Sequence, residues 1–271
     1  MSLVSLIIAL LIEQWRPLAD RSHLFGPLSR YAGFLEEQFN AGETRHGLAA
    51  WMLAVLPAVL GAWLLYWLAA YASPPLALVV NVAALYVTMG FRQFSHAFTA
   101  IQLALKEDDL PHARELLGGW LGQSCSDLTR EEIARLTIEE ALAASHRHVF
   151  GVVFWFVVLP GPTGAILYRL AMFLARRWGA TDGPTEMLNF GKFARDAFAV
   201  LDWLPVRVTA AAFAVIGNFE DAIYCWRTQA SSWKDPALGI VLAAGAGAIG
   251  VRLGMPIVKV DMVVDRPELG V

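Results

Sequence analysis

The segment of residues 47–71, "GLAAWMLAVLPAVLGAWLLYWLAAY", constrains the fold more than any other stretch because it contains no charged residue. A helix needs about 20 consecutive apolar residues to cross the hydrocarbon core of a bilayer, and this segment is long enough. Backbone groups inside a bilayer must be hydrogen-bonded within the protein, so a single spanning segment has to be helical. We therefore predict a membrane protein with a helix over residues 47–71.

The composition supports this prediction and excludes one class of partner. Hydrophobic residues make up 57% of the 271 residues and charged residues 17%, whereas soluble domains have about 45–50% and about 25%. The formal net charge of −3 gives no basic surface of the kind that binds nucleic acid. The two cysteines, Cys125 and Cys225, lack the spacing of a metal site. We expect the lipid bilayer as a partner, no nucleic acid and no protein-bound metal.

Several further apolar segments are short or interrupted. They cover residues 2–12, 76–91, 149–175, 197–217 and 237–251. In 149–175, Pro160-Gly161-Pro162 separates two arms of about 11–13 residues, or roughly 16–20 Å of helix each. Neither arm alone crosses a core of about 30 Å. We predict two short helices meeting at these prolines, either as a re-entrant hairpin or as one kinked span.

The charges of the loops predict an orientation. Residues 13–46 and 92–147 carry several arginines, whereas "ASPP" after residue 71 carries no charge. Because basic loops stay in the cytoplasm, both basic regions are predicted to be cytoplasmic. The expected location is the bacterial cytoplasmic (inner) membrane, crossed several times.

The polar region of residues 92–147 is predicted to be helical. Apolar residues recur at helical spacing in residues 96–122 and 128–148. Thr129 followed by Glu132 matches a capping box, which satisfies free N–H groups at a helix start. No run is typical of a strand. The predicted fold class is all-α: a polytopic integral membrane protein with short or broken helices and a cytoplasmic helical region at about 92–147.

Ionisable residues next to or inside the apolar segments are the first candidates for a site, because such groups are costly in a membrane. Glu13 ends the first apolar segment, and Arg169 lies in the second arm of 149–175. Asp202 and Arg207 lie on either side of Pro205. Their spacing does not allow a simple i, i+4 pair, so they are predicted to face a common pocket. The alternative is that these residues only reach lipid headgroups.

Several blocks of sequence occur in the order found in the CobD/CbiB family of membrane proteins. The resemblance covers most of the chain from about residue 90 onward, and residues 1–271 are expected to form one membrane domain of this kind. The blocks are residues 105–128, 135–155, 161–169, 190–207 and 246–256, followed by "RPELG" at 265–269. That family includes the adenosylcobinamide-phosphate synthase of cobalamin biosynthesis, and the related AmpE proteins are associated with β-lactamase regulation. The resemblance implies an enzyme that joins adenosylcobyric acid to aminopropanol or its phosphate as an amide.

The resemblance also implies site residues. Positions that match the family pattern are Glu139, Tyr168, Arg169, Arg195, Pro205 and Arg207. The catalytic candidates are Glu139, Asp196 and Asp202. The ligand-binding candidates are Arg169, Arg195, Arg207, Tyr168 and Glu13, where Glu13 stands for the family's first acid.

Departures from the family pattern remove mainly carboxylates. Where the pattern has arginine and aspartate, this chain has Gln123 and Ser124, and Ala143-Ala144 replace a glutamate–asparagine pair. A Mg²⁺ site needs oxygen ligands of this kind, so Mg²⁺ is expected only if synthase activity survives. The main prediction is a divergent CobD/CbiB/AmpE-like protein that binds a ligand or regulates. The alternative is the synthase itself, and a solute transporter is a third class.

The retained arginines predict the kind of ligand. Arg169, Arg195 and Arg207 would favour a carboxylate or phosphate group through paired N–H donors. We expect an anionic or corrinoid-like amphiphile bound at the cytoplasmic interface with little help from metal. The oligomeric state is left open by the sequence.

Overall fold

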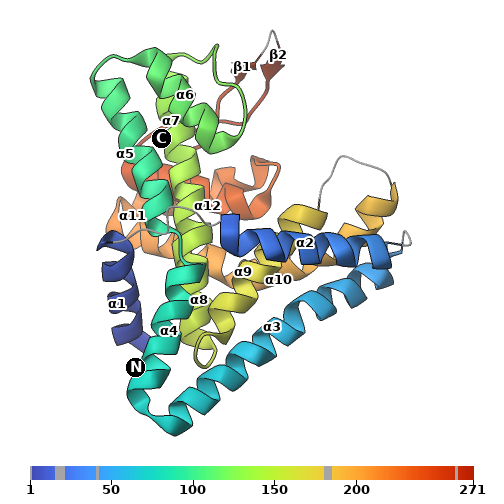
Figure 1. Ribbon diagram of the computed structural model, residues 1–271. Helices are drawn as coiled ribbons and strands as arrows, with labels where there is room; N and C mark the ends of the chain where they lie inside the picture. Colours follow the sequence, from blue (N-terminus) through green and yellow to red (C-terminus); the bar gives the residue numbers. More distant parts are fainter. Residues whose placement is uncertain (1, 16–21, 41–42, 180–184, 260–261) are drawn as a thin grey trace. The chain divides into compact units, whose positions relative to one another are not determined.

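The computed structural model describes residues 2–15, 22–40, 43–179, 185–259 and 262–271, which are mainly helical (Figure 1). The chain divides into two compact units. Unit 1 comprises residues 1–90 and 151–202, and unit 2 comprises residues 91–150 and 203–271. The chain passes between the units inside helical segments, at residues 150–151 and 202–203.

Unit 1 is a group of packed helices. These are α1 (Ser2–Trp15), α2 (Ser22–Phe39), α3 (Thr44–Ala72), α4 (Pro74–Thr88), α8 (Gly151–Val158), α9 (Thr163–Trp178) and the first part of α10 (Thr185–Ile216). Helix α3 packs against α2, α4 and α9, and α1 packs against α4. Trp51, Leu174, Trp178 and Phe190 belong to the buried core that these helices share.

The outer face of α3 confirms the predicted membrane character. Large apolar side chains such as Leu60, Trp63 and Trp67 are about half exposed in the isolated chain. A continuous apolar surface of this kind is unfavourable in water and is expected where lipid covers it. Three helical runs of the described chain, Thr44–Ala72, Arg130–Val158 and Met187–Ile216, are long and apolar enough to cross a membrane.

The predicted break at Pro160-Gly161-Pro162 is confirmed, but the first arm is longer than expected. Helices α8 and α9 pack side by side on either side of this turn (Figure 1). Gly161 has φ +63°, and a Cβ there would lie 2.6 Å from the Tyr66 ring. The expectation of a short, separate first helix is wrong. Helix α8 ends an uninterrupted run from Arg130 to Val158, because no breaker precedes Pro160.

Unit 2 contains the polar helices that the sequence predicts. They are α5 (Phe91–Lys106), α6 (Leu110–Leu121), α7 (Arg130–Ser145), the π-helix η1 (His146–Phe150), the end of α10, α11 (Phe219–Gln229), the 3₁₀-helix η2 (Ala230–Ser232) and α12 (Pro236–Ile249). Helices α5 and α6 meet at Asp108, which has φ +62°. The predicted capping box of Thr129 and Glu132 is present at the start of α7.

A short hairpin corrects the expectation that the chain has no strand. Strands β1 (Ile257–Lys259) and β2 (Met262–Val264) pair antiparallel, with Ile257 opposite Val264 and Val258 opposite Val263. Apolar β-branched residues favour strands, and each run is too short for periodicity to reveal it. The fold class is otherwise as predicted.

Pro205 does not end a helix, because α10 continues through it from Thr185 to Ile216. A proline inside a helix removes one backbone hydrogen bond. The carbonyl that loses its backbone donor is that of Leu201, four residues earlier, and the Trp155 Nε1–H donates to it at 3.1 Å. The Thr209 hydroxyl donates to the Pro205 carbonyl at 2.9 Å, and His146 Nδ1 lies 2.9 Å from the same hydroxyl. Both of these polar side chains are buried, so the proline lies in a well-bonded helix interior.

Candidate functional site

Glu139 on α7 is a buried carboxylate of unit 2, with 7% of its surface exposed. Its Oε1 accepts the backbone N–H of Gly254 at 2.8 Å. Its Oε2 forms an ion pair with Arg266. Both oxygens are thus bound by the segment that follows α12. This segment contains two blocks of the family pattern, 246–256 with Gly254 and 265–269 with Arg266. Glu139 therefore fixes that segment against α7.

A cleft of 390 Å³ opens beside this ion pair. Its walls combine apolar and polar side chains, namely Leu121, Gln123, Leu136, Glu139, Glu140, Trp233, Lys234, Ile257, Asp265, Arg266 and Pro267. The Arg266 guanidinium lies 5.0 Å from the centre of the Trp233 ring, within the range of a cation–π contact. An amphiphilic molecule with a charged group suits such a lining.

The segment that carries Arg266 is held along its length. Leu253 and Leu269 exchange two backbone hydrogen bonds of 2.7 and 3.0 Å. The Gln229 amide donates to the Gly270 carbonyl at 3.0 Å and accepts its N–H at 2.6 Å. The four hydrogen bonds of Leu253, Leu269 and Gly270 fix the segment that carries Arg266 relative to Glu139.

Cys225 lies in the same core cluster as Leu253 and Leu269, and burial raises the pKa of its thiol above the usual range.

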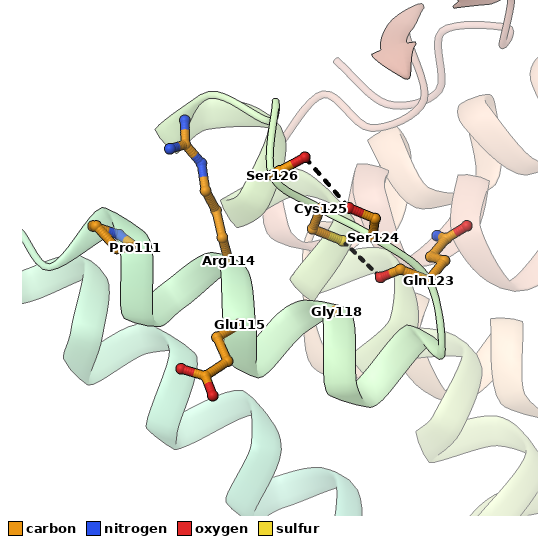
Figure 2. Close-up of a pocket in the computed structure, with 8 residues that line it drawn as sticks. All are labelled: Pro111, Arg114, Glu115, Gly118, Gln123, Ser124, Cys125 and Ser126. Atoms are coloured by element: carbon orange, nitrogen blue, oxygen red, sulfur yellow. Dashed lines mark hydrogen bonds between the residues drawn. The ribbon is translucent and has the colours of Figure 1, made fainter. Parts of the chain in front are cut away.

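A second hollow, of 450 Å³, lies between α6 and the loop that follows it (Figure 2). Arg114, Gln123, Ser124 and Ser126 supply most of its polar lining. Gln123 also lines the Glu139 cleft. The loop in which Gln123 and Ser124 replace the family's arginine and aspartate therefore borders both of these hollows.

In unit 1, two of the predicted site residues are brought together. The Tyr168 hydroxyl donates to Asp202 Oδ1 at 2.8 Å, and both residues are buried. Gly151 lies against the phenol, since a Cβ at that position would be 2.3 Å from the Tyr168 hydroxyl oxygen. The Tyr168 and Phe198 rings are also in contact. Residues of three family blocks thus meet at one tightly packed point.

The other candidates have different surroundings. Arg195 donates to the carbonyls of Gly179 and Leu188, both at 3.3 Å, and so holds the backbone at the end of α9. Asp196 is exposed. Arg207 donates to the Trp203 carbonyl at 2.6 Å and stacks over the Trp203 ring at 3.9 Å.

Glu13 and Arg169 are both buried in unit 1. Asp202 and Arg207 each have a partner of their own, Tyr168 and Trp203. The common pocket of Asp202 and Arg207, and the anion pocket of Arg169, Arg195 and Arg207, stay predictions.

Comparison with known proteins decides the family. The model of the family "CobD/Cbib protein" matches residues 5–271. The chain belongs to the CobD/CbiB family.

Two curated relatives are similar over most of the chain. "Cobalamin biosynthesis protein CobD" of Stutzerimonas stutzeri is 36% identical over 271 residues, which cover 98% of this chain and 87% of the relative. The protein of the same name from Chromobacterium violaceum is 39% identical over 224 residues, 83% of this chain and 69% of the relative. No solved structure matches. The predicted CobD/CbiB membership is confirmed, and the likeness to AmpE stays a prediction.

The Mg²⁺ that the CobD/CbiB resemblance implies does not fit the side chains in the described part of the chain. No group of three or more His, Cys, Asp or Glu residues there could hold a metal ion. Both oxygens of Glu139 are bound by Arg266 and Gly254, and Asp202 accepts the Tyr168 hydroxyl. A Mg²⁺ site requires carboxylate oxygens that face a common point, and Glu139 and Asp202 do not provide one.

Sequence reasoning missed several residues of the cleft beside Glu139. Trp233, Lys234 and Arg266 line it, yet none was a candidate. Arg266 lies in the "RPELG" block, and the presence of this block in the family pattern was the signal that could have made Arg266 a candidate. Its partner Glu139 is 127 residues away in the sequence, and pairing over that distance leaves no periodic pattern to read.

Proposed function

We propose that this chain is a synthase of cobalamin biosynthesis. It would join the carboxyl group of adenosylcobyric acid to the amino group of aminopropanol or its phosphate. Family membership supports this proposal, as does the name "Cobalamin biosynthesis protein CobD" that both relatives carry. These comparisons favour the synthase over a purely regulatory protein.

The observation that carries the proposal is the cleft at Glu139. Blocks 105–128, 135–155, 246–256 and 265–269 all contribute to it or to the contacts that hold it. Its apolar wall, which includes Leu121, Leu136 and Trp233, suits a large amphiphilic substrate. Lys234 and Arg266 supply positive charge for a substrate carboxylate, which arginine and lysine bind through charge-assisted hydrogen bonds.

The chemistry assigns different roles to the carboxylates of the cleft. In amide formation the amine nitrogen bonds to the carboxyl carbon and loses a proton. One carboxyl oxygen leaves on an activating group, for example a phosphoryl group from a nucleoside triphosphate. Glu139 acts as a positioning residue, because its oxygens are already bound by Gly254 and Arg266. Glu140 and Asp265 are the other carboxylates in the cleft and the candidates to accept the proton.

Complementation tests the activity. A bacterial strain that lacks its cobinamide synthase is grown on cobyric acid with this chain supplied from a plasmid. We expect growth with the wild-type chain and with Glu131→Gln, an exposed residue of α7, and loss of growth with Arg266→Met. Absence of growth with wild-type protein that is present in the membrane would refute the proposal.

We also propose that the chain crosses the bacterial inner membrane several times as one family domain, with residues 92–147 in the cytoplasm. The apolar runs of α3 and α10 and the basic residues outside them support this. Cysteines introduced at Arg147 and Arg177 should react from the same side if α9 returns as a re-entrant hairpin. Labelling from opposite sides would favour a kinked span.

A ligand-binding or regulatory protein without synthase activity is the second candidate. It is favoured by one observation, the lack of a fitting Mg²⁺ ligand set in the described residues. Its ligand would be the anionic or corrinoid-like amphiphile predicted from the sequence. It predicts binding of cobyric acid by the purified protein without growth in the complementation experiment.

A further inference from the structure

Helix α11 of unit 2 has one covered face and one open face. Its inner face packs against α12, and Ala222 on this face is fully buried. The fit is close, since a Cβ at Gly247 of α12 would lie 2.5 Å from the Asp221 carbonyl oxygen. On the outer face, Phe219 is 59% exposed and Tyr224 is 58% exposed. Two large aromatic side chains on one open helix face are typical of an interaction surface.

The outer face carries a groove of 500 Å³ that is lined by residues of α11 alone. Its walls are two rows of side chains at four-residue spacing: Phe219, Ile223 and Arg227 in one row and Glu220, Tyr224 and Thr228 in the other. A groove between such rows is the surface into which the side chains of a second helix pack. The shape of the groove therefore fits an α-helix.

The charges of the groove restrict what can cover it. Glu220 and Arg227 are both exposed, and neither forms an ion pair within the described residues. Hydrocarbon is a poor cover because it would surround both charges. Water is a poor cover for the rings of Phe219 and Tyr224. A helix that brings a base to Glu220 and an acid to Arg227 suits both kinds of group.

A second copy of α11 is such a helix. The six residues that line the groove are placed symmetrically along the helix about a point midway between Ile223 and Tyr224. When a second copy lies antiparallel across a two-fold axis at this point, Glu220 of each copy lies opposite the partner's Arg227. The surface is thus complementary to itself, as the interface of a two-fold dimer must be.

We propose that the outer face of α11 is the interface of a two-fold dimer of this chain, with two Glu220–Arg227 ion pairs between the copies. Opposite charges across an interface fix the register and disfavour other partners. The apolar surface extends to Val215 and Ile216 at the end of α10, which are also exposed. No residue of α11 lines the Glu139 cleft, and the dimer does not depend on the proposed synthase activity.

The molar mass of the full chain in a mild detergent, measured by light scattering, tests the dimer. We expect the wild-type chain to be dimeric. Glu220→Arg places like charges opposite each other at both ends of the groove, and Arg227→Glu does the same with the other sign. We expect either change to weaken the dimer about ten-fold or more. The variant with both changes restores opposite charges and should dimerise like wild type.

Co-expression of chains with two different tags separates loss of the interface from damage to the fold. Chains with Glu220→Arg should co-purify with chains that carry Arg227→Glu, because opposite charges then meet at both ends of the groove. Neither variant should co-purify with a differently tagged copy of itself. Recovery of this kind requires that the two positions meet in the dimer.

Glu131→Arg is the matched control. Glu131 is exposed and holds the same second position in α7 that Glu220 holds in α11, so its reversal should leave the dimer unchanged. A monomeric wild-type chain would overturn the proposal and assign the outer face of α11 to lipid. A dimer that tolerates both single charge reversals would overturn it as well, because the interface would then lie elsewhere.

Discussion

Two buried carboxylates, Asp202 in unit 1 and Glu139 in unit 2, have different surroundings. Asp202 accepts the hydroxyl of Tyr168, a neutral donor that is itself fully buried against Gly151. Glu139 pairs with a charged partner, Arg266, and the pair borders a cleft. Both positions belong to family blocks, so membership of a block does not distinguish structural from functional residues. Access of the side chain to a cleft does distinguish them, because a substrate can reach Glu139 but not Asp202.

The largest expected effect separates the two carboxylates by stability. Replacing Arg266 with methionine removes the charged partner of Glu139 and leaves the Gly254 N–H as its hydrogen-bond donor among the described residues. Breaking a buried ion pair on one side costs about 3–5 kcal/mol. We expect a clear fall in the unfolding temperature measured in nanodiscs. Glu139→Met with Arg266→Met should recover much of the loss, and a single variant as stable as wild type would show that the pair contributes little.

A smaller effect is expected at the neutral contact of unit 1. Tyr168→Phe removes the hydroxyl that donates to Asp202 and should cost about 1–3 kcal/mol, the penalty for a buried acceptor that loses its donor. Tyr71→Phe is the control, because Tyr71 is largely exposed. Growth in the complementation assay, compared at equal protein level, should persist with Tyr168→Phe. Loss of growth with unchanged stability would instead place Tyr168 in the reaction.

A still smaller effect is expected at the start of α7, which carries Glu139. Thr129→Ala removes one side of the capping box, and losing such a cap costs about 1 kcal/mol. The unfolding temperature should fall slightly, with cobyric acid binding unchanged. Ser126→Ala, an exposed residue of the preceding loop, is the control for stability. An unchanged unfolding temperature for Thr129→Ala would mean that packing alone fixes this helix start.

The same contrast shows what the sequence could predict. Local signals worked: the uncharged run 47–71 became α3 (Thr44–Ala72), and Thr129 with Glu132 formed the capping box. The continuation of α7 into α8 was missed, because the polar stretch 128–148 and the apolar stretch 149–175 were treated as separate segments. The contacts of Glu139 with Gly254 and Arg266 span 115 and 127 residues. Such pairs depend on how helices pack, and no local pattern encodes them.

The smallest expected effect concerns Asp196, one of the catalytic candidates from the sequence. It precedes Asp202 on the same helix, but its side chain is exposed, whereas the neighbouring Arg195 holds the backbone carbonyls of Gly179 and Leu188. Exposed polar substitutions away from such contacts usually change stability by no more than about 0.5 kcal/mol. Asp196→Asn should therefore leave both the unfolding temperature and growth on cobyric acid unchanged.

Arg195→Met provides the comparison for Asp196→Asn, since it removes the two bonds at the end of α9 and should lower the unfolding temperature. If Asp196→Asn abolishes growth while the protein remains folded, exposure in the isolated chain is a poor guide to function in this family. Asp196 would then return as a catalytic candidate, and the assignment of the reaction to the Glu139 cleft alone would be wrong.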